Sequence, residues 1–129
     1  AESGADEVDV EGHTLLYQVN SDGVKRRHTR PADFGLPEGK RNHLVAESIE
    51  HSAQIIKDMF AGAGAGHNPP VAPETSRRNV VVLNSATALM AAGKAAAFQE
   101  AAVMAQDSID SGAAQAKLNS LIKISQAQS

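Results

Sequence analysis

Two adjacent carboxylates near the start of the chain, Asp6 and Glu7, are the residues best suited to bind a cation. Neighbouring side chains on a regular strand point to opposite faces, so the pair can converge on one ion only at a strand start or a bend, which is where Gly4 places it. Mg²⁺ typically takes one or two protein carboxylates and completes its shell with water and substrate phosphates. Spacing alone, however, favours an exposed acidic strand end over a magnesium site.

Two further segments could bind phosphate groups. The glycine-rich run 62–66 resembles a phosphate loop, but such a loop follows a strand and opens a helix, whereas this run follows a helix and leads into proline-rich sequence, which is typical of a linker. The basic run 25–30, KRRHTR, could bind nucleic acid by releasing phosphate counterions. A net charge of −3, one Tyr and no Trp favour a solvated strand instead.

Histidine and amide side chains offer weaker signals. The five His residues lack the spacing of a zinc site, and the absence of Cys excludes thiolate zinc sites, disulfides and cysteine nucleophiles. Asn84 stands inside the most apolar segment, where an unpaired amide costs free energy. It could contact a ligand, but a buried structural hydrogen bond is the favoured interpretation.

The composition indicates one small domain with a thin core. The chain has 129 residues with 12 basic and 15 acidic side chains, and many of its 42% hydrophobic residues are Ala, which buries little surface. No stretch approaches the length of a transmembrane helix, and the first 20 residues lack the pattern of a signal peptide. A soluble protein is expected.

The predicted elements are short strands within 6–30 and a connector over 31–43, followed by helices. Alternating apolar residues before Asn20-Ser-Asp-Gly23 predict a β-hairpin whose charged return strand is solvated. Helices are predicted over 44–61, 77–92, 95–111 and 113–125, with a flexible loop over 62–76. Ser48 is a candidate N-cap, Gly93 and Gly112 are predicted helix ends, and the stripe Val45, Ile49, Ile56 and Phe60 is predicted to face the core.

Several motifs, in this order along the chain, resemble those of anthranilate phosphoribosyltransferases. Gly4-Ala-Asp-Glu-Val8 is similar to the acidic motif of that family, and Asp33-Phe-Gly-Leu-Pro37 to its connector. The segment 80–95, VVVLNSATALMAAGKA, with DSIDSG at 107–112 and LNSL at 118–121, resembles its C-terminal helices. The resemblance runs from about residue 4 to residue 125.

The resemblance implies a fold, a reaction and a cofactor. It implies that residues 1–129 form the C-terminal segment of a larger α/β domain, with the remaining strands upstream. It implies transfer of a phosphoribosyl group from phosphoribosyl diphosphate to anthranilate in tryptophan biosynthesis, in the cytoplasm or in a plastid. Asp6 and Glu7 would then bind the cofactor Mg²⁺, which holds the donor diphosphate.

The family's phosphoribosyl loop and its anthranilate-binding residues are absent from the 129 residues. We therefore expect the substrate-binding residues to lie mainly upstream, assign no catalytic residue here, and expect this segment alone to be inactive. A homodimer formed through the upstream part is the implied assembly, with no nucleic acid or membrane partner.

Two alternatives remain open from the sequence. One is a related pyrimidine nucleoside phosphorylase, which shares the domain plan and also handles a ribose phosphate; upstream sequence would separate the two. The other is a noncatalytic relative that binds nucleic acid through the basic strand.

Overall fold

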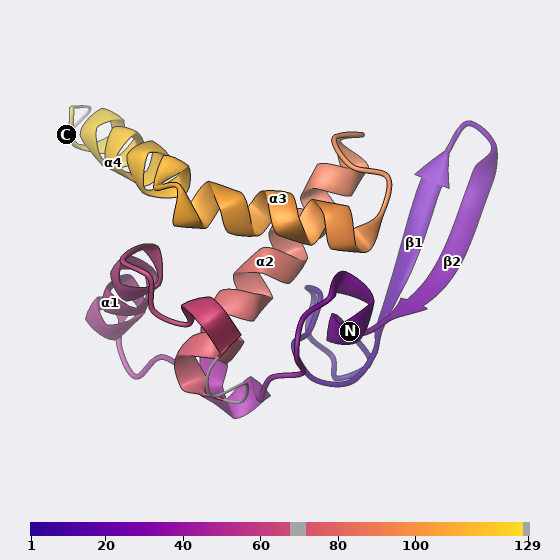
Figure 1. Ribbon diagram of the computed structural model, residues 1–129, viewed down its shortest axis with the longest axis horizontal. Helices are drawn as coiled ribbons and strands as arrows, with labels where there is room; N and C mark the ends of the chain where they lie inside the picture. The colour runs from indigo at the N-terminus through magenta and orange to yellow at the C-terminus, as the bar shows by residue number, and fades with distance from the viewer. Residues whose placement is uncertain (68–71, 128–129) are drawn as a thin grey trace.

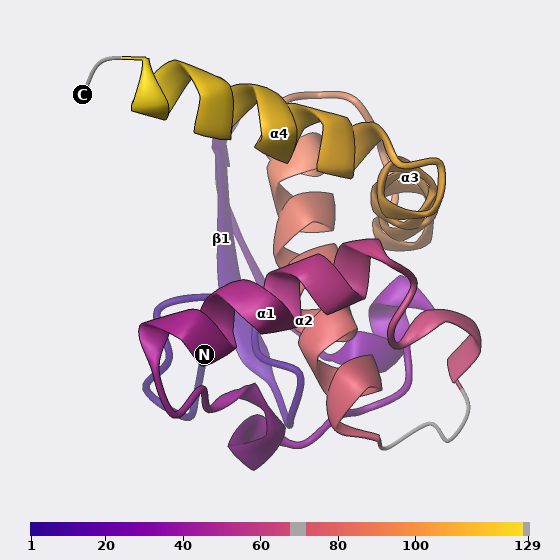
Figure 2. The same cartoon turned by 90° about the vertical axis from the view of Figure 1, so that its left-hand side faces the viewer.

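The computed structural model describes residues 1–67 and 72–127. A two-stranded antiparallel hairpin precedes four α-helices, and the long helix α2 lies at the centre (Figures 1 and 2). The helices are α1 (Ile49–Phe60), α2 (Pro73–Ala91), α3 (Phe98–Asp110) and α4 (Ala113–Gln126). The hairpin and four helices agree with the α/β fragment expected from the sequence. None of the described helices is long and apolar enough to cross a membrane.

The hairpin consists of β1 (Thr14–Asn20) and β2 (Gly23–Thr29), paired from Thr14 opposite Thr29 to Asn20 opposite Gly23. The turn falls where the sequence predicted it. The return strand is exposed until Thr29, as its charges indicate. The prediction that strands begin at residue 6 was wrong, because residues 6–13 turn away and bond to other parts of the chain.

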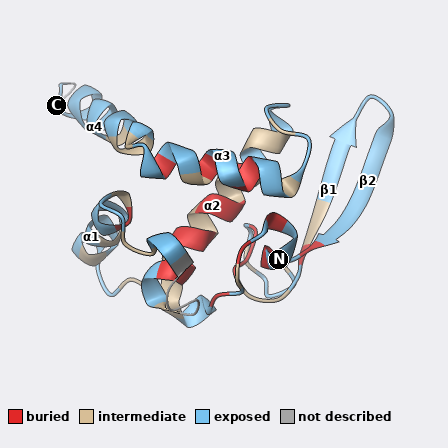
Figure 3. Cartoon of the chain, viewed as in Figure 1, coloured by how far each residue is buried: buried red, intermediate tan, exposed pale blue. Residues whose placement is uncertain are grey.

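The core lies where α2 meets α3, the N-terminal loop and the connector that follows the hairpin. Buried side chains from these elements form one cluster (Figure 3). Its members are Val8, Val10, Phe34, Leu36, Val82, Leu83, Ala86, Ala101, Ala102, Ala105 and Ile109. The connector thus carries Phe34 and Leu36 into the core, as predicted, and the Phe34 ring lies 4.6 Å from that of Phe98. Alanine at the contact between α2 and α3 makes the core thin.

Three helix starts differ from the prediction, and the start of α3 does so by three residues, at Phe98 instead of residue 95. Helix α1 begins at Ile49 rather than at residue 44, because the Ser48 hydroxyl accepts a hydrogen bond from the His51 amide and so caps the helix there. A separate 3-10 turn, Arg41–Leu44, occupies the residues before it. Helix α2 begins four residues before position 77, at Pro73, a residue that suits the first turn of a helix. The predicted loop 62–76 therefore ends sooner, and its positions 68–71 lie outside the described residues.

The predicted core stripe of α1 holds only at Phe60, which packs against the core cluster, whereas Val45, Ile49 and Ile56 are exposed. Ile49 is 84% exposed and Val45 is 66% exposed, whereas Met59 is the buried residue of this helix. Figure 2 shows α1 lying against one side of α2. Helix α4 has no buried residue, and its Leu121 and Ile122 are 62% and 40% exposed. Periodicity identified both helices but not the face that is buried.

Candidate metal-binding loop

The acidic pair lies on a bend at the surface. Asp6 and Glu7 are both exposed and fall on consecutive bend residues, not on a strand. Neither carboxylate has a hydrogen bond or ion pair to the part of the chain that the structure describes. Immediately after them the chain enters the core, since Val8 and Val10 are 5% and 0% exposed. Two free carboxylates are therefore presented at the point where a loop becomes anchored.

Asn84 of α2 anchors this loop through the backbone of Val8. The Val8 amide donates to Asn84 Oδ1 at 2.9 Å, and Asn84 Nδ2 donates to the Val8 carbonyl at 3.0 Å. The same Nδ2 donates to the Val80 carbonyl within the helix at 2.9 Å. Asn84 thus makes the structural hydrogen bonds predicted for it, although they are partly rather than fully buried, and their partner Val8 lies one residue after Glu7.

Asp9 forms the second anchor of the loop. Its side chain is 2% exposed and accepts hydrogen bonds from the Ser3 hydroxyl at 2.6 Å and from Arg41 Nε at 2.9 Å. The Glu11 amide also donates to it, at 3.2 Å. Burial raises the pKa of Asp9, but the hydrogen bonds from Ser3, Glu11 and Arg41, with the charge of Arg41, outweigh burial and lower the pKa below its usual value.

A third set of contacts joins the loop to the connector before α1. The Glu11 carboxylate accepts from the Arg41 amide at 3.0 Å, and this bond lowers the pKa of Glu11, as do the nearby charges of Lys40 and Arg41. The Gly39 amide donates to the Val10 carbonyl at 2.9 Å. A Cβ on Gly39 would lie 2.9 Å from Ser76 Oγ, so only glycine fits between the loop and α2 without displacement.

Polar side chains of α2 bind the backbone of the irregular connector, which has no strand partner in a sheet within the described residues. Ser76 Oγ accepts from the Lys40 amide at 3.2 Å, and Asn79 Nδ2 donates to the Pro37 carbonyl at 3.1 Å. Arg77 Nε donates to the His43 carbonyl at 2.7 Å. None of these side chains was singled out from the sequence. The available signal was a run of polar residues directly before the apolar stretch of the same helix.

The other candidate segments do not join the acidic pair. Gly62, Gly64 and Gly66 form a tight turn against α2 rather than opening a helix, and a Cβ on Gly64 would approach the Glu74 carbonyl oxygen to 2.5 Å. The basic run lies on the exposed strand β2, where the Arg27 guanidinium sits 5.6 Å from the Phe98 ring centre. Among the described residues, no side chain of either segment forms a hydrogen bond or ion pair with Asp6 or Glu7.

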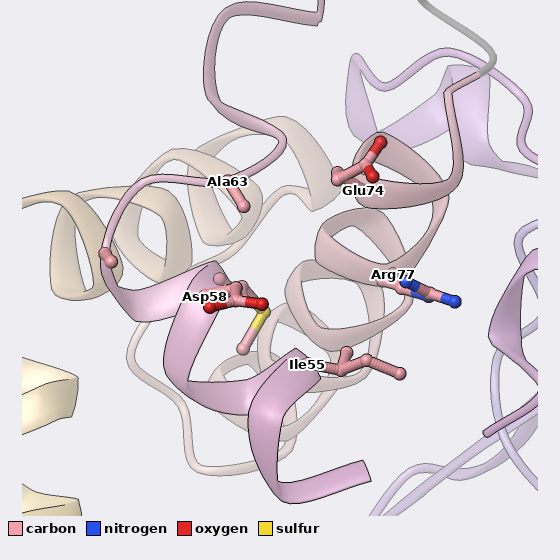
Figure 4. A pocket seen from close by; sticks show the side chains of 7 residues that line it. Ile55, Asp58, Ala63, Glu74 and Arg77 are labelled. Carbon is pink, nitrogen blue, oxygen red and sulfur yellow. The ribbon is translucent and has the colours of Figure 1, made fainter. Parts of the chain in front are cut away.

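A cavity of about 370 Å³ lies elsewhere, between α1 and the start of α2 (Figure 4). Asp58 comes from α1, and Glu74 and Arg77 come from α2. The guanidinium of Arg77 points away from both carboxylates, toward the carbonyl of His43 that it bonds. Neither residue of the acidic pair lines this cavity.

Within the described ranges, no three His, Asp or Glu side chains gather into a group that could hold a metal ion. Any ion at the acidic pair would therefore have two protein carboxylates and would take its remaining ligands from water or from a bound substrate. This is the coordination that Mg²⁺ accepts and that an all-protein cage for Ca²⁺ does not use.

Residues 1–115 match the profile described as "Glycosyl transferase family, a/b domain". Among curated relatives, the chain is 34% identical over 122 residues to anthranilate phosphoribosyltransferase of Rubrobacter xylanophilus, covering 95% of this chain and 33% of that protein. It is 37% identical over 122 residues to the enzyme of the same name from Rhodopirellula baltica, covering 94% and 32%. The chain thus spans about a third of the length of these relatives.

Solved structures share the fold. Anthranilate phosphoribosyltransferase of Saccharomyces cerevisiae in complex with 4-fluoroanthranilate superimposes with a TM-score of 0.77 at 22% identity, over 92% of this chain and 32% of that one. The yeast enzyme in complex with phosphoribosyl diphosphate and Mg²⁺ gives a TM-score of 0.76 at 23% identity. The hairpin and helices described above therefore occur as one part of a larger protein in that enzyme.

Proposed function

The chain belongs to the glycosyl transferase family with an a/b domain, and we propose that it is the C-terminal part of an anthranilate phosphoribosyltransferase. The proposed reaction is transfer of a phosphoribosyl group from phosphoribosyl diphosphate to the amine of anthranilate. The observation that carries the proposal is the free acidic pair on an anchored bend. Its support includes the ordered motifs and curated relatives at 31–37% identity that bear this enzyme's name.

The residues present fit a magnesium ion. Mg²⁺ prefers carboxylate oxygen and keeps several waters, so two exposed carboxylates with no competing partner among the described residues meet its needs. Asp6 and Glu7 would hold the ion, and the anchored backbone after them would keep both on one side of the loop. Solved relatives include one described as having Mg bound and one in complex with phosphoribosyl diphosphate and Mg.

Transfer at the sugar carbon breaks the bond to diphosphate and leaves negative charge on the departing group. A bound Mg²⁺ supplies positive charge that stabilises this leaving group. The part played by this chain is to hold and orient: Asp6 and Glu7 provide the ligands, while Asn84 and Asp9 fix the loop that carries them. No side chain here is assigned as a general base.

We propose that the groups that bind the two substrates lie mainly in other parts of the whole protein. Since the chain spans about a third of its relatives, those parts would bind phosphoribosyl diphosphate and anthranilate. Those parts would also supply the surfaces of the proposed homodimer. The segment by itself would then be inactive.

Substitution of the acidic pair tests this proposal in the full-length protein. Asp6→Asn removes one charged ligand with little change in volume, so we expect Mg²⁺-dependent turnover to fall by about 100-fold or more, because the ion supplies several kcal/mol of leaving-group stabilisation. Asp22→Asn, an exposed acid in the hairpin turn, is the matched control and should retain turnover. Full turnover in Asp6→Asn would overturn the assignment of the metal site.

A further inference from the structure

The contact between Asn84 and Val8 pairs a side-chain amide with both polar groups of one backbone residue. The Val8 amide and carbonyl each meet the complementary atom of Asn84, at 2.9 and 3.0 Å, across 76 residues of sequence. This two-point contact fixes the orientation of the peptide groups as well as their position, since both atoms of the amide must be satisfied together. Strand pairing would do the same, but residues 6–13 have no strand partner.

We propose that Asn84 is a positioning residue for the magnesium site, a role that rests on the proposed function. The Val8 amide belongs to the peptide group that follows Glu7 directly. The hydrogen bond that this amide donates to Asn84 Oδ1 therefore holds the backbone to which the Glu7 side chain is attached. Among the described residues, the side chains of Asp6 and Glu7 have no hydrogen bond or ion pair that could orient them. The rigid body that carries the metal ligands is therefore helix α2, acting through Asn84.

The chemistry of the site makes this orientation matter. Two adjacent carboxylates converge on one ion only in a particular bend conformation, because on a regular strand they point apart. Loss of the contact would let the bend sample other conformations, each of which must be reversed before both oxygens reach Mg²⁺. The cost would appear as weaker metal binding even though both ligand residues, Asp6 and Glu7, are still present in the sequence.

The same linkage runs in reverse. If Asn84 stabilises the bend that binds Mg²⁺, then Mg²⁺ must stabilise the bend that bonds to Asn84. Binding of the ion should therefore slow hydrogen exchange at the Val8 amide, and this effect should depend on Asn84. Such a readout does not require catalysis.

The test is hydrogen–deuterium exchange of the segment from Ala5 to Val10 in the full-length protein, titrated with Mg²⁺ alone. Two variants remove the contact. Asn84→Ala removes both bonds, and Asn84→Leu removes both while keeping a branched side chain of similar shape. The matched control is Thr87→Val on the same helix, because Thr87 Oγ1 also donates to a carbonyl one turn back, at 2.9 Å from Leu83, but does not reach the loop.

We expect exchange in this segment to become about tenfold faster in the Asn84 variants, and the Mg²⁺ concentration for half-maximal protection to rise by about tenfold, as for one lost hydrogen bond. Thr87→Val should match the parent protein. Faster exchange with an unchanged Mg²⁺ midpoint would overturn the inference and reduce Asn84 to a structural residue.

Asp6→Asn separates the two proposals in the same experiment. If Asp6→Asn abolishes the Mg²⁺ protection but the Asn84 variants keep the parental midpoint, the inference fails and the metal site stands. If Asp6→Asn keeps the parental midpoint, the metal site fails and the inference fails with it. Should Asn84→Ala not fold, Asn84→Leu alone carries the comparison with Thr87→Val.

Discussion

At the residue scale, the loop combines two free carboxylates with a third that is fully engaged. Asp6 and Glu7 are exposed, whereas Asp9, two positions later, is 2% exposed at its side chain and bonded to Ser3 and Arg41. A buried carboxylate is tolerated only when it is paired and hydrogen-bonded. The two exposed acids are therefore free to bind a ligand, whereas the buried acid serves to anchor the loop.

The engaged acid predicts a pH dependence of stability. Because the pKa of Asp9 is lowered on folding, its contribution is fully present above the ordinary aspartate pKa of about 3.9 and is lost as the pH falls through the lower pKa of the folded state. Asp9→Asn should lower the free energy of unfolding at pH 7 by about 1–3 kcal/mol. It should also weaken the loss of stability below pH 4.

Urea unfolding between pH 7 and pH 3 measures both effects. Arg41→Met provides the complementary change, since it leaves the Asp9 carboxylate buried without its cation and should destabilise the protein at pH 7. An Asp9→Asn protein with the parental stability at every pH would show that the network does not anchor the loop.

The acidic pair was recognisable from the sequence, but its anchors were not. A bend at Asp6 was foreseeable because Gly4 precedes it. The partner of Asn84 was not, because it lies 76 residues away and belongs to the backbone, which carries no sequence signal. Asn84 could be flagged only as a polar residue in an apolar helix.

At the element scale, local signals located the helices better than they oriented them. Ser48, Gly93 and Gly112 mark helix ends through their own chemistry, and the structure has helix ends at each. The buried face depends on neighbours that periodicity does not identify, so Ile49 was placed in the core although it is 84% exposed. Strand extent failed for a similar reason, since residues 6–13 bond to α2 and the connector instead of to a strand.

The glycine run before α2 gives a prediction at this scale. Gly64 and Gly66 both have positive φ, 81° and 82°, but a Cβ would meet the Glu74 carbonyl only at Gly64 and meets no described atom at Gly66. Gly66→Ala should lower the free energy of unfolding by about 1–2 kcal/mol through backbone strain alone. Gly64→Ala should cost about 1–3 kcal/mol more through the added clash.

Chemical denaturation of the two variants isolates the clash, because each serves as the backbone control for the other. Equal destabilisation would mean that the turn does not pack against α2 as described. The result bears on the site because Arg77, which bonds the connector, lies one turn along the same helix from Glu74.

At the scale of the whole molecule, α2 is the element that joins everything else. The N-terminal loop, the connector, α1 and α3 all contact it, and buried residues occur along α2 from Thr75 to Ala86 (Figure 3). The large apolar side chains that remain exposed lie on the hairpin, α1, α3 and α4, with Val45 just before α1. The family match is consistent with a segment that carries the proposed metal ligands Asp6 and Glu7, while the substrate-binding groups are proposed to lie in the rest of the protein.

The most direct test of the central claim is the fluorescence of anthranilate, followed in the presence of phosphoribosyl diphosphate and the full-length protein, with the intact mass determined from the same sample. The account predicts a loss of fluorescence that requires both Mg²⁺ and the diphosphate donor, stops when the metal is chelated, and resumes when Mg²⁺ is restored. Unchanged fluorescence with a folded protein of full-length mass, or a loss that continues after chelation, would contradict it.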